Sequence, residues 1–152
     1  MSYQSIREFK KNLPKVKLDP IEYCNILKIS SRALYDRIGE VKCPILNENV
    51  VFNGRGFHHL LNNSDGTARD VNEIIHKLTF LPLAKSVIKN ASRIEEERDV
   101  MIRESRKKNS KLKKAKTYCL VARVGNKKPV EVRVILLRIG DGILMFRSVM
   151  RN

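Results

Sequence analysis

Long apolar runs are missing from this chain of 152 residues. None reaches the ~18 consecutive apolar residues that a transmembrane helix needs, so the sequence predicts no membrane span and no membrane partner. The opening stretch MSYQSIREFKK also has no apolar core of the kind that secretory signal peptides carry. We therefore expect a cytoplasmic protein.

Cysteine is scarce as well. Cys24, Cys43 and Cys119 are odd in number and widely spaced, and no two of them form a CxxC pair. This spacing argues against a disulfide framework or a zinc site, and predicts reduced cysteines buried as small apolar side chains. Carboxylates do not cluster with the histidines either, since Asp70 and Glu73 both fit a helix. The sequence therefore predicts no metal site and no cofactor.

Acidic residues are outnumbered by basic ones. The chain has 16 Asp and Glu against 31 Lys and Arg, which gives a net charge of +15. Such an excess favours a polyanionic partner, and nucleic acid before all others. Seven basic residues and no acidic one lie between positions 106 and 116. We expect a solvated or mobile basic arm there that binds phosphate without reading sequence.

Helical signals dominate the first part of the chain. Residues 3–13 carry apolar side chains at helical spacing. A second helix is expected from Pro20, with Asp19 as its N-cap, and a third from Ser30 or Ser31. These would be three short helices that form an N-terminal segment.

The composition then changes toward a main domain. We divide the chain into a helical segment, residues 1–45, and a second domain, residues 46–152, which opens with a brief strand at 50–52. Asp70 can cap a strongly periodic helix, and Pro82 should kink or split it. The domain therefore continues with helices before its last third.

The last third alternates between apolar and polar residues. Residues 117–124 and 130–139 are predicted strands, and the GDG at 140–142 is typical of a hairpin. Helices followed by antiparallel strands indicate an α+β fold, in which the helices pack on one face of a C-terminal antiparallel sheet. We expect the other face to be partly bare and to carry cations.

The hairpin leaves two registers open. A two-residue loop at 141–142 makes Ile135 face Ser148 and brings Arg133 near Ser148 on the same face. A three-residue loop makes Val134 face Ser148 and separates the polar groups. We expect the first register because it leaves the valines to the core.

The stretch FNGRGFHHLL, residues 52–61, holds two of the three histidines. Its glycines predict a tight turn that a partner can approach closely, and Arg55 between them offers a guanidinium suited to phosphate. His58 and His59 are side chains that ordinarily titrate near neutral pH. Adjacent residues of a helix point about 100° apart, so only one can act at one phosphate. We expect His59 to act, with His58 as the alternative.

Three stretches in this order resemble a known family. They are FNGRGFHHLL, DVNEIIHKLTFLPLAKSVIKNA and VEVRVILLRIGDGILMFRSVM, within residues 50–150. A histidine-bearing helix, a long helix, a charged segment and a terminal sheet ending in an Arg-Ser strand are similar to the BECR superfamily of toxin-type ribonucleases. The superfamily takes its name from the barnase, EndoU, colicin-type and RelE nucleases, and the phage-associated branch is the most similar. The resemblance implies metal-independent RNA cleavage by 2′-OH attack, with tRNA among the candidate substrates.

The resemblance also implies roles for individual residues. The family's helix histidine maps to His59 or His58, its polar position on the last strand to Ser148, and its basic sheet positions to Arg133 and Arg138. The chain departs from the EndoU pattern, whose two separate histidines and lysine are not clearly present. Such cleavage needs an acid, a base and cations that stabilise the transition state. We assign catalysis to His59, His58, Ser148 and Arg133, and RNA binding to Arg55, Arg138, Arg147, Lys111, Lys113 and Lys114.

A second class of function stays open: a non-catalytic nucleic-acid-binding protein, such as a regulator of a phage or mobile element. Its candidate helix-turn-helix would lie in the N-terminal helices, although residues 20–40 show no recognition helix rich in Arg, Asn or Gln.

A toxin-type ribonuclease, in contrast, would harm the cell that makes it. We therefore expect an acidic antitoxin or immunity protein that competes with RNA for the same cations.

Overall fold

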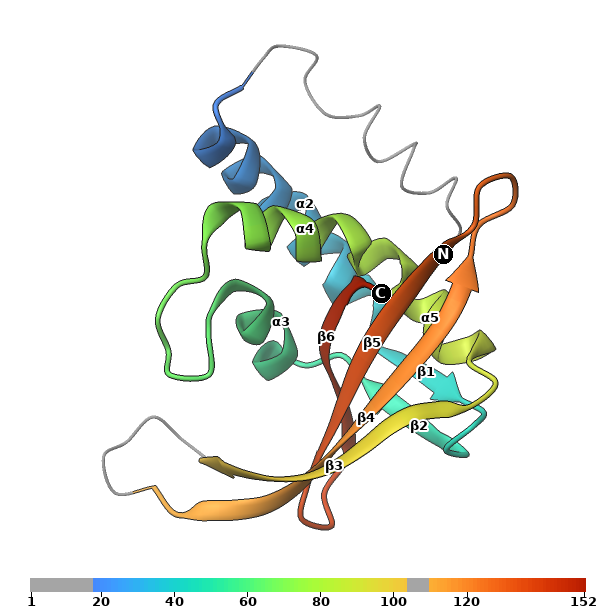
Figure 1. Cartoon of the computed structure of the whole chain (residues 1–152). Coiled ribbons are helices and arrows are strands. Elements are labelled where there is room, and N and C mark those ends of the chain that lie inside the picture. The colour runs from blue at the N-terminus through green and yellow to red at the C-terminus, as the bar shows by residue number, and fades with distance from the viewer. Residues whose placement is uncertain (1–17, 104–109) are drawn as a thin grey trace.

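The computed structural model describes residues 18–103 and 110–152 (Figure 1). The expected helix at 3–13 lies outside these residues. The elements are α2 (Pro20–Ile38), β1 (Glu40–Cys43), β2 (Glu48–Val51), α3 (Gly54–Leu61), α4 (Val71–Phe80), the 3-10 turn η1 (Leu81–Leu83), α5 (Ala84–Asn90), β3 (Ile94–Arg103), β4 (Leu112–Val124), β5 (Val130–Ile139) and β6 (Leu144–Arg151). None of the described helices combines the length and the apolar character that crossing a bilayer requires.

The first described helix is one continuous element where two short helices were expected. Asp19 caps α2 as predicted, because its carboxylate accepts bonds of 2.7 and 3.1 Å from the backbone N–H groups of the first turn. Ser30 does not begin a new helix. Its hydroxyl donates to the carbonyl of Ile26 at 3.2 Å, so it satisfies itself within the helix and the backbone continues. The helix ends before Gly39, whose φ is 62°.

The α+β prediction is confirmed, with a different sheet from the one expected. Six strands follow the order β1-β2-β6-β5-β4-β3. Strands β2 and β6 are parallel, and the other neighbours are antiparallel, so the sheet is mixed. The last strand of the chain, β6, therefore lies inside the sheet, between β2 and β5.

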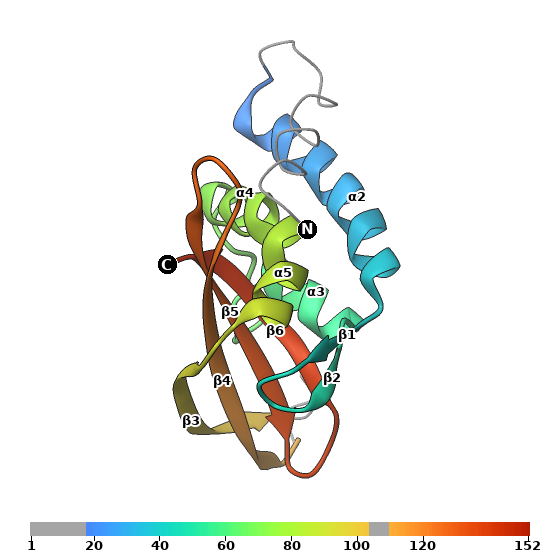
Figure 2. The same ribbon diagram turned by 90° about the vertical axis from the view of Figure 1, so that its right-hand side faces the viewer.

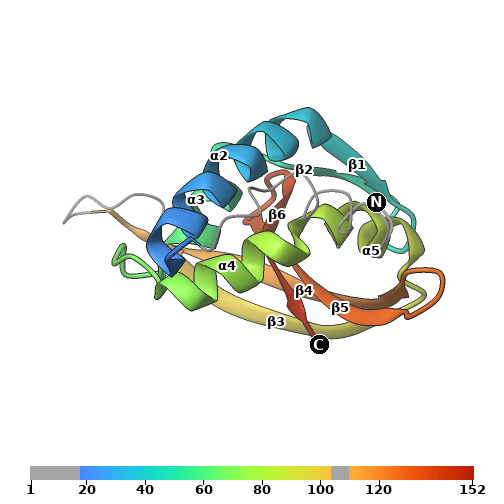
Figure 3. The same ribbon diagram turned by 90° about the horizontal axis from the view of Figure 1, so that it is seen from above.

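Helices cover one face of this sheet. Helices α4 and α5 run across β4, β5 and β6, and α2 packs on the outer side of α4 (Figures 2 and 3). The expected boundary at residues 45–46 falls in the turn between β1 and β2. Tyr35 of α2 is buried in the same core as the sheet, with its ring 5.2 Å from Phe57 and 5.9 Å from Phe146. Residues 18–45 thus share the core of the rest of the chain.

The long periodic segment splits at its proline, as predicted. Asp70 caps α4 by accepting a 3.2 Å bond from the backbone N–H of Asn72. The 3-10 turn that contains Pro82 then separates α4 from α5. Proline lacks the N–H that a continuous helix would use, so this position tightens the backbone into a short turn.

The β5–β6 hairpin combines both expected registers. Near the loop Arg138 pairs with Leu144, which corresponds to the three-residue loop. Farther along, Ile135 pairs with Ser148, as the two-residue loop would have produced. The two pairings are compatible because Arg147 has no partner on β5 and forms a β-bulge.

The charged segment before β4 contains a strand that the sequence did not reveal. Strand β3 occupies residues 94–103 and pairs with β4 along its length. Of the expected basic arm, residues 106–116, the first four lie outside the described residues, whereas Lys113 and Lys114 belong to β4 and so to an ordered strand.

The sheet face opposite α4 and α5, which we expected to be partly bare and to carry cations, holds Arg133. It carries a small apolar cluster, which we name the apolar shelf. The shelf consists of Val100, Ile102, Ala115, Leu137, Ile139 and Met145.

Candidate functional site

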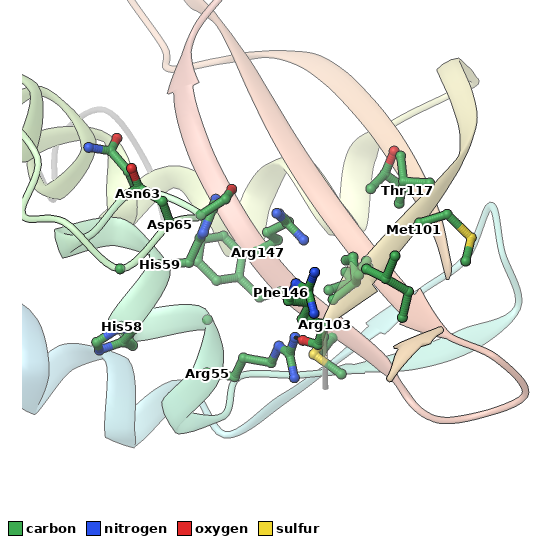
Figure 4. A pocket seen from close by; sticks show the side chains of 18 residues that line it. Arg55, His58, His59, Asn63, Asp65, Met101, Arg103, Thr117, Phe146 and Arg147 are labelled. Carbon is green, nitrogen blue, oxygen red and sulfur yellow. Dashed lines mark hydrogen bonds between the residues drawn. The ribbon is translucent and has the colours of Figure 1, made fainter. Parts of the chain in front are cut away.

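A groove of about 880 Å³ lies between α3 and the sheet (Figure 4). One wall comes from α3 and the loop at residues 63–66, and the other from β3, β4, β5 and β6. Arg55, His58, His59 and Arg147, all expected at the site, line this groove. The structure therefore brings together part of the predicted site.

Helix α3 lies unusually close to β6. Its N-cap is Asn53, whose side-chain oxygen accepts a 3.2 Å bond from the backbone N–H of Gly56. The two glycines expected in a turn thus form the first turn of the helix. A Cβ at Gly56 would collide with the carbonyl oxygen of Phe146 and the hydroxyl of Tyr35. Glycine at this position lets α3 approach the strand that carries Arg147.

His59 is half-buried and held by Arg69. The Nη2 of Arg69 lies 3.2 Å from His59 Nε2, and its Nε donates to the His59 carbonyl at 2.9 Å. A guanidinium can only donate, so Nε2 must be the acceptor, and we assign the ring proton to Nδ1. Burial, and then the positive charges of Arg147 and Arg69, lowers the pKa of His59 to about 3. His59 is therefore neutral at pH 7.

Arg147 is the half-buried cation of the groove. It stands at the bulge of β6, and its side chain makes no hydrogen bond or ion pair with any residue that the structure describes. Burial and the nearby charges of Arg55 and Arg69 lower the pKa of Arg147. The guanidinium of Arg147 therefore has no counter-charge among the described residues, although partly buried cations are ordinarily paired.

Lys77 is a functional candidate that sequence reasoning missed. Its side chain is only 6% exposed, and Nζ donates to the hydroxyl of Ser148 at 2.7 Å. Burial, and then the positive charge of Arg69, lowers the pKa of Lys77 to about 8. One signal was present in the sequence: Lys77 stands on the apolar stripe of α4, three residues after Ile74 and directly before Leu78.

Carboxylates are few around these cations. Among Arg69, Lys77 and Arg147, only Arg69 forms an ion pair within the described part of the chain, with Glu73 at 2.8 Å. Asp65 is the acidic residue among the groove-lining side chains. It accepts bonds of 2.6 and 2.9 Å from the hydroxyl and backbone N–H of Thr67, which lower its pKa.

Two further groove residues come from α3. The Nη2 of Arg55 donates to the carbonyl of Arg103 at 3.1 Å and so links the helix to the end of β3. His58 is exposed, and its Nδ1 lies 3.3 Å from the side-chain nitrogen of Asn62. Its ring lies apart from the other labelled side chains (Figure 4). His59 is thus the histidine that adjoins the cations, while His58 lies at the rim.

The other predicted residues lie elsewhere. Arg133 donates to the side-chain oxygen of Asn152 at 3.0 Å, near the chain end. Arg138 makes two bonds, of 2.6 and 2.8 Å, to the carboxylate of Glu48 and so ties β5 to β2. Ser148 lies behind the groove wall, bonded to Lys77 as described. Three exposed lysines at the start of β4 flank the groove without lining it: Lys111, Lys113 and Lys114.

The arrangement suits an anion. Four basic side chains, Arg55, Arg69, Lys77 and Arg147, exert their positive charge on a neutral histidine that lines the groove. Among Arg69, Lys77 and Arg147, the described residues provide one ion-paired carboxylate. Among these residues, no group of three or more His, Cys, Asp or Glu is placed to hold a metal ion. No family model, curated protein or solved structure matches the chain.

Proposed function

We propose that the protein is a metal-independent endoribonuclease of toxin type, which binds an RNA phosphodiester in the groove beside His59. The observation that carries the proposal is the half-buried guanidinium of Arg147, which has no counter-charge among the described residues. A phosphate oxygen would supply that charge, and a guanidinium matches phosphate with two parallel N–H bonds. The BECR resemblance of the sequence points to the same chemistry.

The cations would do more than bind. Attack of the 2′-OH on phosphorus concentrates negative charge on the non-bridging oxygens in the transition state. Arg147 and Arg55 line the groove and are placed to stabilise that charge. Arg55 is already held by its bond to the carbonyl of Arg103, which limits the reorganisation that the reaction requires of it.

His59 is the side chain that would move a proton. In the empty groove its pKa is about 3, because of burial and the surrounding positive charges. A bound phosphate cancels part of that positive field and competes for the N–H groups of Arg69. The competition frees Nε2, and both effects raise the pKa of His59 toward the range where imidazole accepts a proton from the 2′-OH. As the 2′ oxygen bonds to phosphorus, the bond from phosphorus to the 5′ oxygen breaks. The departing 5′ oxygen then takes up the proton that His59 accepted, passed on through water, so that a 2′,3′-cyclic phosphate and a 5′-hydroxyl result.

Lys77 and Ser148 would support the site from behind. The oxygen of Ser148 accepts the 2.7 Å bond from Lys77, which leaves the hydroxyl proton of Ser148 available to a different acceptor. The charge of Lys77 also contributes to the field at His59. We assign both residues to positioning and electrostatics.

One observation favours a binding protein without catalysis. At neutral pH His59 is a neutral imidazole with its single ring proton on Nδ1, and its Nε2 is already occupied by Arg69. A protein that only grips phosphate would use the same cations and need no change at His59. This second candidate differs from the first in one measurable respect, which is the fate of the RNA.

The deciding experiment is incubation of the purified chain with RNA in excess EDTA. A ribonuclease of this mechanism leaves 2′,3′-cyclic phosphate and 5′-hydroxyl ends, and it leaves an all-deoxy strand of the same sequence intact. His59→Ala should lower the cleavage rate by about 10²–10⁴-fold with little change in RNA affinity. His76→Ala is the matched control, because His76 accepts a bond from the backbone N–H of Arg151 outside the groove. Intact RNA with tight binding would establish the binding protein instead.

The cellular setting follows from the same proposal. An active enzyme acting on cytoplasmic RNA needs an inhibitor in the cell that makes it. We propose an acidic protein that places carboxylates against Arg55 and Arg147 and so competes with RNA. Expression of the wild-type chain alone should slow growth, and His59→Ala should relieve the effect.

A further inference from the structure

The two walls of the groove differ in chemistry. The α3 side carries the cation Arg55 and the neutral His59, and Arg147 of β6 adds a second cation beside them. The sheet side is lined largely by apolar side chains, including Val100, Ile102, Leu137 and Met145 of the apolar shelf. A ligand that fills the groove must therefore be anionic at one end and apolar at the other.

The shelf and the cations are directly connected. Met145 and Arg147 are two positions apart on β6, which corresponds to about 7 Å along a strand. One ligand can therefore reach both. Apolar surface beside the shelf is also exposed at the far end of the groove, where Met101 is 55% and Leu112 is 51% exposed. Such apolar surface next to a charged end is typical of a ligand site.

Polar side chains interrupt the apolar wall at Arg103, Thr117 and Arg147, and Thr117 is the uncharged one among them. Thr117 pairs with Leu137 on β5, and Leu137 pairs with Met145 on β6, so the three form one cross-strand row. Thr117 lines the groove near Met101, and its hydroxyl makes no hydrogen bond within residues 18–103 and 110–152 (Figure 4). A hydroxyl in this position can both donate and accept, as the edge of a nucleobase requires.

We infer that the apolar shelf is a nucleobase subsite, in which the base next to the scissile phosphate lies on the half-buried side chains of Val100 and Ile102 and bonds Thr117 through its edge. Leu137 and Met145 are buried and form the apolar support against which Val100 and Ile102 pack. The inference rests on the proposed function for the phosphate itself. A base can lie on this surface only when it is unstacked, so the substrate class is single-stranded RNA or RNA with an extruded base. Thr117 is then a specificity-determining residue.

Binding of small ligands tests the nucleobase subsite separately from the phosphate site of the proposed function. We would titrate the wild-type protein with inorganic phosphate, ribose 5-phosphate and the four nucleoside 3′-monophosphates, using calorimetry and methyl NMR. The subsite predicts that at least one nucleotide binds about 10-fold more tightly than ribose 5-phosphate, because apolar area on the shelf is covered. It also predicts shifts of the Val100 and Ile102 methyl signals with nucleotides and not with inorganic phosphate.

Substitution of Thr117 tests recognition of the base edge. Thr117→Val keeps the shape of the side chain and should change the order of preference among the four nucleotides, with affinity for inorganic phosphate unchanged. Thr79→Val is the matched control, because its hydroxyl donates to the carbonyl of Ile75 within α4. The control should leave all affinities unaltered.

The remaining outcomes are distinguishable. Equal affinity for nucleotides and ribose 5-phosphate would overturn the subsite and leave the phosphate site standing. In that case self-association that is lost in Val100→Thr would identify the shelf as a contact between copies. Failure of every ligand to bind, inorganic phosphate included, would overturn the proposed function together with the subsite.

Discussion

Gly56 shows how one residue governs the approach of two elements. A Cβ there would meet the Phe146 carbonyl and the Tyr35 hydroxyl, whereas a Cβ at Gly54 would meet nothing within 4 Å. Gly56→Ala should therefore lower the free energy of unfolding by about 2–3 kcal/mol through overpacking. Gly54→Ala should leave it unchanged or raise it by about 0.5–1 kcal/mol, since alanine favours the helix. Urea denaturation of both variants measures the contrast, and equal effects would contradict the close approach of α3 to β6.

Lys77 is buried in a position that favours function at the expense of stability. Its charge is disfavoured by burial and by Arg69, which is why its pKa falls to about 8. Lys77→Met replaces it with an apolar side chain of similar length. We expect the variant to unfold with a free energy about 2 kcal/mol higher at pH 7 and to lose most of its RNA cleavage. A destabilised variant would show instead that the bond to Ser148 outweighs the cost of the buried charge.

The same residue predicts a dependence on pH. The native pKa of Lys77, about 8, lies below the ordinary value near 10.4, so between these values the unfolded chain binds more protons than the folded one. The cost of burying the charge is complete below pH 8 and disappears as pH rises through about 10.4. The stability difference between Lys77→Met and wild type should therefore shrink over this window. Melting temperatures of the pair at pH 7, 9 and 10.5 provide the measurement.

At the scale of elements, β5 and β6 present arginines of two kinds. Arg138 on β5 is paired with Glu48 of β2, whereas Arg147 at the β6 bulge has no such partner among the described residues. Arg147→Gln should lower kcat/KM for RNA cleavage by about 10²-fold, because a transition-state cation is removed. Arg138→Gln should keep cleavage within a few-fold of wild type and cost less than about 1 kcal/mol of stability. Similar losses in both variants would contradict this division of the sheet cations.

Elements with local signals were predictable. Asp19 and Asp70 cap helices through their own side chains, and Pro82 divides a helix by lacking an N–H, so a short stretch of sequence decides each outcome. Strand β3 was missed because its pattern, IEEERDVMIR, is mostly charged. It lies at the edge of the sheet, where one partner strand supplies its pairing and burial does not select apolar side chains.

Residues of the candidate site were predictable only where the residue type itself indicates the chemistry. The pair of histidines four residues or fewer after Arg55 indicated His59. For Lys77 the local signal was its place on the apolar stripe of α4, but its bond to Ser148 depends on the distant β6, which no local pattern encodes. The placement of Arg147 likewise depends on a β-bulge that the amino-acid sequence of the hairpin does not specify. Arg138 is bound to the carboxylate of Glu48, ninety positions away in the sequence, and so links two strands of the sheet.

At the scale of the whole molecule, a net charge of +15 should make RNA binding strongly dependent on salt. The lysines at the start of β4 extend the positive field beyond the groove. Replacing Lys111, Lys113 and Lys114 with Gln should flatten the slope of log K against log salt by about 0.7 per lost phosphate contact on a single strand. The cleavage positions should stay the same, because these residues do not line the groove. Filter binding at several salt concentrations gives the slope, and altered cleavage positions would contradict the non-specific role.

The inner position of β6 determines when, during synthesis of the chain, the candidate anion site can form. A chain made from its N-terminus contains α3 and α4, with His59 and Lys77, long before it contains residues 144–151. Until then β2 has no parallel neighbour, Lys77 lacks Ser148, and the groove lacks Arg147. A growing polypeptide therefore has no assembled anion site until β6 has been added and has paired with β2 and β5.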